Sequence, residues 1–98
     1  MMSLPPDSPA VAHGLGLFET ILVAGGRPVH MAAHYERMAR SSARLGLPVP
    51  DEVTFRHAVE VAARDAVGET AVRCIWVAVK DSNDPESWML NATAQPIR

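Results

Sequence analysis

The apolar residues of this 98-residue chain recur at two different spacings. Three short runs rich in β-branched and aromatic residues are typical of strands, and they cover residues 17–23, 71–79 and 88–94. A Gly-Gly pair at residues 25–26 predicts a tight turn after the first run, because glycine adopts positive φ at low cost. Residues 27–30 are then expected to return as a further strand.

Helical spacing separates the first pair of predicted strands from the second. Residues 31–45 place one set of side chains on a single helical face. The set comprises Met31, His34, Tyr35, Met38, Ser42 and Leu45. Asp51 is a typical N-cap for a second helix, in which an apolar stripe repeats until Gly68 closes it.

This order of elements predicts an α+β fold: an antiparallel β-sheet with two helices packed on one side. We expect residues 13–98 to form this small domain, and residues 1–12, with three of the eight prolines, to form an irregular arm. Strand 71–79 is apolar on both faces, whereas helices on one side cover one face. The other face is therefore expected to meet a second domain or a second subunit.

Composition narrows the class of protein. A hydrophobic content of 48% with 20% charged residues suits a folded domain, and a net charge of −2 argues against nucleic-acid binding. The single cysteine fits a reducing compartment, and the sequence contains no run long enough to span a membrane, so a cytoplasmic protein is expected.

His34 and Arg37 are the leading candidates for chemistry. They lie three residues apart and are neighbours on the predicted helix, where an arginine can present paired donors to a phosphate. Phe18 and Thr20 share one face of the first strand, and they could line a pocket or simply fill the core. His30 and His34 have a metal-ligand spacing, but no glutamate follows His30 and no cysteine pair accompanies them, so no metal site is expected.

Three motifs give the chain a family resemblance. They are GLGLFET at residues 14–20, the glycine turn at 25–26, and His-Tyr-Glu-Arg at 34–37 followed by SSARLGL. In this order they resemble the start of the class IV aminotransferases. These are the fold-type IV pyridoxal 5'-phosphate (PLP) enzymes, which include branched-chain and D-amino-acid aminotransferases and aminodeoxychorismate lyase. The match is to the small N-terminal domain of that family.

The resemblance implies roles for particular residues. Arg37 would bind the PLP phosphate, and Phe18 and Thr20 would line the substrate pocket. The Schiff-base lysine and the acid facing the pyridine nitrogen belong to a second, larger domain in that family. We therefore expect no catalytic residue in this chain, and Lys80, its one lysine, to be an ordinary exposed side chain.

Two functions follow as hypotheses. The first is a domain or fragment of a PLP-dependent enzyme, closest to aminodeoxychorismate lyase in 4-aminobenzoate and folate synthesis or to an amino-acid aminotransferase. Its partners would be the large PLP domain, absent from this chain, or a homodimer partner, and its substrate an amino acid or aminodeoxychorismate. The chain alone would then be inactive. The second is a non-catalytic module of the same fold that binds an anion or another protein.

Overall fold

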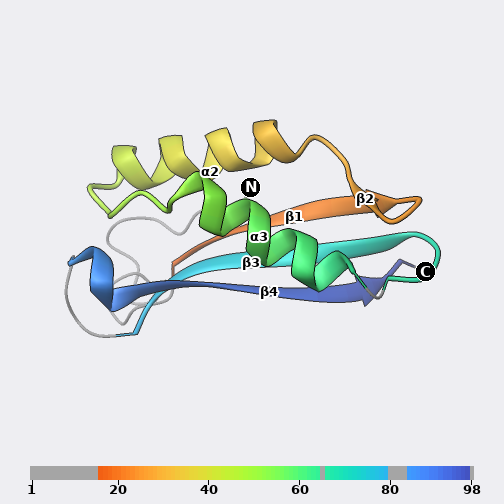
Figure 1. Cartoon of the computed structure of the whole chain (residues 1–98). Helices are drawn as coiled ribbons and strands as arrows, with labels where there is room; N and C mark the ends of the chain where they lie inside the picture. The colour runs from red at the N-terminus through yellow and green to blue at the C-terminus, as the bar shows by residue number, and fades with distance from the viewer. Residues whose placement is uncertain (1–15, 65, 80–83, 98) are drawn as a thin grey trace.

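The computed structural model describes residues 16–64, 66–79 and 84–97. Within these residues an antiparallel sheet has the strand order β2-β1-β3-β4, and helices α2 and α3 lie over one of its faces (Figure 1). The elements are β1 (Leu17–Ala24), β2 (Arg27–Pro28), α2 (Met31–Arg44), α3 (Glu52–Ala63), β3 (Thr70–Ala78), the 3-10 turn η1 (Pro85–Ser87) and β4 (Trp88–Pro96). This arrangement confirms the predicted α+β fold. The expected arm at residues 1–12 and Lys80 lie outside the described residues.

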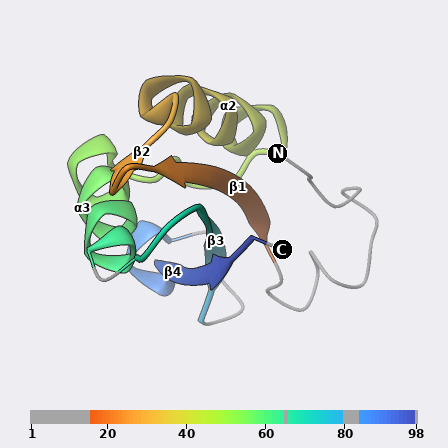
Figure 2. The same cartoon turned by 90° about the vertical axis from the view of Figure 1, so that its right-hand side faces the viewer.

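The sheet is built around the pairing of β1 with β3. Their register runs from Leu17 opposite Trp76 to Val23 opposite Thr70, and β4 pairs along the other edge of β3. Figure 2 shows that the sheet curls, with both helices on the same side of it. The short β2 pairs with Val23 and Ala24, so no described strand covers the outer edge of β1 between Leu17 and Ile21.

The predicted return strand at residues 27–30 is too long. β2 contains Arg27 and Pro28, and His30 instead adopts the left-handed conformation with φ 58° and ψ 42°. This residue is the N-cap of α2, so the chain leaves the sheet at once and starts the helix. The glycine turn before β2 is confirmed, because Gly25 and Gly26 have φ values of 60° and 78°.

The core fills the space between the sheet and the helices. Alternate residues of β1 and β3 face the helices, and Ile21, Val72 and Cys74 are fully buried there. The helices contribute Met38, Phe55 and Val59, which are also fully buried. Their hydrophobic contacts in this cluster confirm the predicted helical faces.

The other face of the sheet is open. Thr20, Leu22, Arg73 and Met89 are exposed on it, and Ile75 is half-buried. The predicted alternation in β3 is therefore confirmed: one set of its side chains packs under the helices and the other does not. Among the described residues, nothing covers this second face.

Helix α3 starts where the sequence predicts and ends earlier than expected. Asp51 is its N-cap, and its Oδ2 accepts a hydrogen bond from the Thr54 N–H at 3.0 Å. The helix ends at Ala63, before Gly68. Beyond it the N–H of Ala66 donates to the carbonyl of Ala63 at 3.0 Å, a bond between residues three apart instead of the helical four. No helix within the described residues is long and apolar enough to cross a membrane.

Two side chains fix the loop between the helices. The Tyr35 hydroxyl donates to the carbonyl of Pro50, and Trp76 Nε1 donates to the carbonyl of Pro48, each at 2.7 Å. Tyr35 also packs edge-on against Phe55, with ring centroids 5.4 Å apart. These contacts hold α2 and α3 at a defined separation above the sheet.

Gly16, which precedes β1, gives the first prediction. A Cβ atom at this position would lie 1.7 Å from the backbone oxygen of Trp76, which cannot move without distorting β3. We therefore expect Gly16→Ala to lower the free energy of unfolding by about 3 kcal/mol, at the upper end of the cost of overpacking. Urea denaturation of the 98-residue chain measures this change.

Gly46→Ala is the matched control. Gly46 has φ 72° but no atom within 4 Å of an added Cβ, so the substitution carries backbone strain of about 1 kcal/mol alone. An equal or smaller loss for Gly16→Ala than for Gly46→Ala would contradict the close approach of Gly16 to β3.

Candidate functional site

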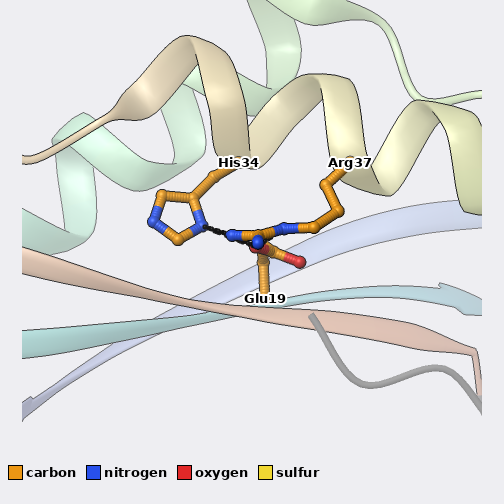
Figure 3. A network of polar contacts seen from close by, with 3 residues as sticks. All are labelled: Glu19, His34 and Arg37. Carbon is orange, nitrogen blue, oxygen red and sulfur yellow. Dashed lines mark hydrogen bonds and ion pairs between the residues drawn. The ribbon is translucent and has the colours of Figure 1, made fainter.

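A buried carboxylate lies between β1 and α2. Glu19 rises from β1 toward the helix, and His34 and Arg37 reach down to it from successive turns of α2 (Figure 3). One oxygen of Glu19, Oε1, contacts both His34 and Arg37. It lies 2.5 Å from His34 Nδ1, 3.1 Å from Arg37 Nε and 2.9 Å from Arg37 Nη2. We refer to Glu19, His34 and Arg37 as the carboxylate cluster.

The local structure explains why these three side chains meet. In a strand, alternate residues face the same side, so Glu19 points toward the helices together with Leu17 and Ile21. In a helix, residues three apart are neighbours, so His34 and Arg37 descend side by side. The contact between His34 Nδ1 and the carboxylate requires the proton on that nitrogen, so His34 donates to Glu19.

Burial makes this cluster energetically important. The Glu19 side chain is fully buried, and a buried carboxylate is stable when paired with charged or hydrogen-bonding partners. Arg37 and His34 supply these partners. The Arg37 side chain, in contrast, is 50% exposed, so the guanidinium spans the boundary between the protein interior and solvent.

The orientation of Arg37 leaves donors available. Glu19 engages Nε and Nη2, and Nη2 also lies 3.2 Å from His34 Nδ1. Within the described residues, no hydrogen bond involves Nη1 of Arg37. A guanidinium held along one edge in this way can offer its remaining N–H groups to an oxyanion outside the cluster.

Phe18 and Thr20 lie on the opposite side of β1 from the carboxylate cluster. Thr20 is exposed and Phe18 is half-buried on the open face, where the Arg73 guanidinium carbon lies 4.4 Å above the Phe18 ring. The structure thus brings Phe18 and Thr20 together and separates them from Arg37 by the thickness of one strand. All three flank the part of β1 whose outer edge no described strand covers.

Glu19 was not among the site residues predicted from the sequence. The feature that could have pointed to it is a single acidic residue at an inward position of an apolar strand, between Leu17 and Ile21. The register also places Glu19 directly opposite Cys74 on β3. Burial, and then the negative charge of Glu19, raise the pKa of the Cys74 thiol from 9.0 to about 12. The thiol therefore stays protonated near neutral pH and is a core residue without nucleophilic character.

Comparison with known proteins identifies the family to which this fold belongs. Residues 16–97 match the class IV aminotransferases, and the chain belongs to this family. It is 42% identical over 71 residues to the bifunctional aminodeoxychorismate lyase / D-amino acid transaminase of Mycobacterium tuberculosis. That match covers 72% of this chain and 25% of the relative.

Solved structures agree with this assignment. A hypothetical aminotransferase from Mycobacterium tuberculosis in its PLP-bound form has a TM-score of 0.73 and 32% identity. The α-ketoglutarate and PMP bound form gives 0.75 and 31%. In both cases the match covers 100% of this chain and 35% of that chain. The chain therefore spans about a quarter of the curated relative and about a third of these structures.

The carboxylate cluster gives a prediction about stability. We expect a double-mutant cycle with Glu19→Gln and Arg37→Met to report a coupling energy of about 2 kcal/mol, because each substitution leaves the other partner without its counter-charge. Urea denaturation of the four proteins measures it. The exposure of Arg37 keeps the value below that of a fully buried pair.

The exposed pair Glu52–Arg56 is the matched control. Its atoms are 3.0 Å apart, but both side chains are substantially exposed, at 50% and 41%. The corresponding cycle should give about 0.5 kcal/mol or less. Equal coupling in the two cycles would mean that the burial of Glu19 adds nothing to its interaction with Arg37.

Proposed function

We propose that this chain is the phosphate-anchoring domain of a PLP-dependent class IV enzyme, either an aminodeoxychorismate lyase or an amino-acid aminotransferase. The observation that carries the proposal is the half-exposed Arg37 guanidinium, held along one edge by a buried carboxylate. Family membership supplies the cofactor class, because the related structures carry PLP or PMP. The curated relative is named for both a lyase and a transaminase activity, which supports keeping both reactions.

The residues of the carboxylate cluster fit a phosphate group. A phosphate needs directional donors, and arginine presents planar pairs of N–H groups that match its oxygens. Glu19 would not compete for the remaining donors, since its contacts with Arg37 are on Nε and Nη2. Arg37 would hold the phosphate, and Glu19 and His34 would fix the direction in which Arg37 points.

The cofactor and the substrate would be contacted from opposite sides of β1. When bound, PLP supplies an electron-withdrawing ring that stabilises the carbanion formed from an amino-acid substrate. Arg37 would position the ring by its phosphate from the helix side of β1. Phe18 and Thr20 would form part of the substrate pocket from the open side, next to the uncovered edge of the strand. Neither role requires this chain to supply the cofactor-binding lysine.

The partner would be the large domain of the same enzyme, or a second subunit. Two observations support this part of the proposal. The related proteins are three to four times longer than the matched region, as their coverages of 25% and 35% indicate. The open face of the sheet also exposes Leu22 and Met89, at 41% and 49%. Covering such a face would remove apolar surface from water.

The donors of Arg37 also support the alternative function, a non-catalytic binding module. Arg37 can offer donors to any oxyanion, so a non-catalytic module of this fold could use the same cluster to bind an anion, and its open face to bind a protein. The two functions differ in whether phosphate binding supports a reaction.

Two substitutions on α2, Arg37→Ala and Arg40→Ala, test the role of Arg37. We expect Arg37→Ala to weaken PLP binding about 10- to 100-fold, since it removes charge-assisted hydrogen bonds, while Arg40→Ala changes it less than about twofold. Arg40 lies one turn further along α2 and is exposed. The titration uses a chimera in which this chain replaces the matching segment of the Mycobacterium tuberculosis relative. Equal losses from both substitutions would indicate a diffuse basic surface instead of a site.

The isolated chain serves as the negative control for this experiment. We expect it to show neither transaminase nor lyase turnover, whereas the chimera should show at least one of them. Turnover by the isolated chain, with a borohydride-reduced adduct on Lys80, would overturn the assignment of the lysine to another domain. A chimera that binds PLP through Arg37 but never turns over would favour the anion-binding alternative.

A further inference from the structure

A second candidate site lies beside the start of α2, one helical turn before His34 of the carboxylate cluster. The β1–β2 turn, the start of α2 and the end of α3 meet there (Figure 1). They line an open groove of about 440 Å³, a volume within the size range of sites for small molecules. Its lining includes Arg27, Met31, Arg56, Glu60, Ala63 and Arg64. We refer to it as the arginine groove.

The groove carries an excess of positive charge. Three guanidinium groups and one carboxylate line it, although the whole chain has a net charge of −2. Within the described residues, no carboxylate lies within ion-pair distance of Arg27 or Arg64. Among the described residues, these two arginines therefore have no paired carboxylate that would compete with a ligand. Clustering like charges in this way is unfavourable unless solvent or an anion compensates it.

The third arginine has a carboxylate partner on its own helix. Arg56 donates from Nε to Glu52 Oε2 at 3.0 Å, and its Nη2 lies 3.0 Å from the same oxygen. This exposed contact between residues four apart on α3 occupies one edge of the guanidinium. The opposite edge of Arg56 remains available to the groove, in the same way that Glu19 leaves donors of Arg37 free.

The start of α2 adds a second favourable feature. Met31, the first residue of α2, lines the groove. The N-cap His30 makes no side-chain capping hydrogen bond, and the first turn contains no acidic residue. The backbone N–H groups of this turn thus retain their partial positive charge next to the arginines. The C-terminal end of α3 contributes an opposing partial charge, which Arg64 at its C-cap offsets.

The groove is not polar throughout. Met31 lines it and is half-buried, so part of its apolar side chain faces the groove. A bare ion would leave this surface uncovered. A ligand with an oxyanion on a short apolar body would use both parts, placing the oxyanion between the guanidinium groups and the body against Met31.

We propose that the arginine groove binds a small molecule that carries a phosphate or carboxylate group on a short apolar body. The groove has a different lining from the carboxylate cluster, because it includes none of Glu19, His34 and Arg37. Met31 lies one helical turn before His34, so the two sites are neighbours along α2. Ligand bound there would contact the start of α2, and Arg37 lies on the same helix, so the site is placed to affect the cofactor-anchoring arginine.

Amide NMR of the ¹⁵N-labelled chain tests the proposal with three probes: phenyl phosphate, benzoate and inorganic phosphate. Phenyl phosphate should give saturable shifts at Arg27, Met31 and Arg64. Arg27→Ala and Arg64→Ala should each weaken its binding about tenfold, the loss expected for one charge-assisted contact. Both arginines are exposed, so these variants should keep the fold, and the dispersion of their spectra checks this.

A matched variant separates the groove from other positive surfaces. Arg44→Ala removes an exposed arginine at the opposite end of α2, and it should not change affinity at the groove. Equal weakening by Arg44→Ala, or shifts that do not saturate with phenyl phosphate or benzoate, would overturn the proposal.

The probes also identify the group that is recognised. Stronger binding of phenyl phosphate than of benzoate would assign a phosphate ligand, and the reverse order would assign a carboxylate. Both results support an oxyanion site. Inorganic phosphate binding as tightly as phenyl phosphate would contradict the contribution of the apolar surface.

Discussion

The burial of one carboxylate, that of Glu19, sets the position of helix α2. A charged group at this depth is stable when its partners lie close by, and α2 supplies two of them from neighbouring turns. The helix must therefore lie over β1 with His34 and Arg37 facing down. The apolar contacts of Met38 and the hydrogen bond of Tyr35 to Pro50 agree with the same placement. Apolar packing alone would tolerate small shifts of the helix, whereas an ion pair with a 2.9 Å contact would not.

The alternation of side chains along β1 determines how the site is divided. Glu19 faces the helix and acts through Arg37, while Phe18 and Thr20 face the open side of the sheet. One strand thus separates the proposed phosphate anchor from the proposed substrate wall. The uncovered outer edge of β1 is the place where one ligand could reach both. In the proposed function another domain would complete this site, and the related proteins are longer than the region that they share with this chain.

Periodicity predicted most of the fold, because burial follows it directly. The helical face around Met38 and the covered set of β3 side chains could both be read from spacing. Asp51 could be identified as an N-cap because a side-chain oxygen satisfies a local amide. The motif resemblance pointed to Arg37. Glu19 was missed because an acidic residue in a strand is normally solvent-exposed, and its partners lie 15 and 18 residues away in sequence.

The remaining differences also come from tertiary structure. The left-handed conformation of His30 shortens β2, and a positive φ is uncommon for any residue other than glycine, although histidine adopts it more often than most. The arginine groove unites Arg27 with Arg56 and Arg64, which come from a turn and from the second helix. Their proximity depends on how α3 packs against the β1–β2 turn. Sequence spacing carries no information about this contact.

The most direct test of the account asks whether Glu19 acts through Arg37. PLP affinity would be measured in the chimera for Glu19→Gln, for Arg37→Ala and for the double variant. We expect Glu19→Gln to weaken binding about tenfold when Arg37 is present, because the guanidinium loses its fixed orientation, and to have no further effect when Arg37 is absent. The same tenfold loss in both backgrounds would contradict the account, since Glu19 would then affect the cofactor by a route that does not involve Arg37.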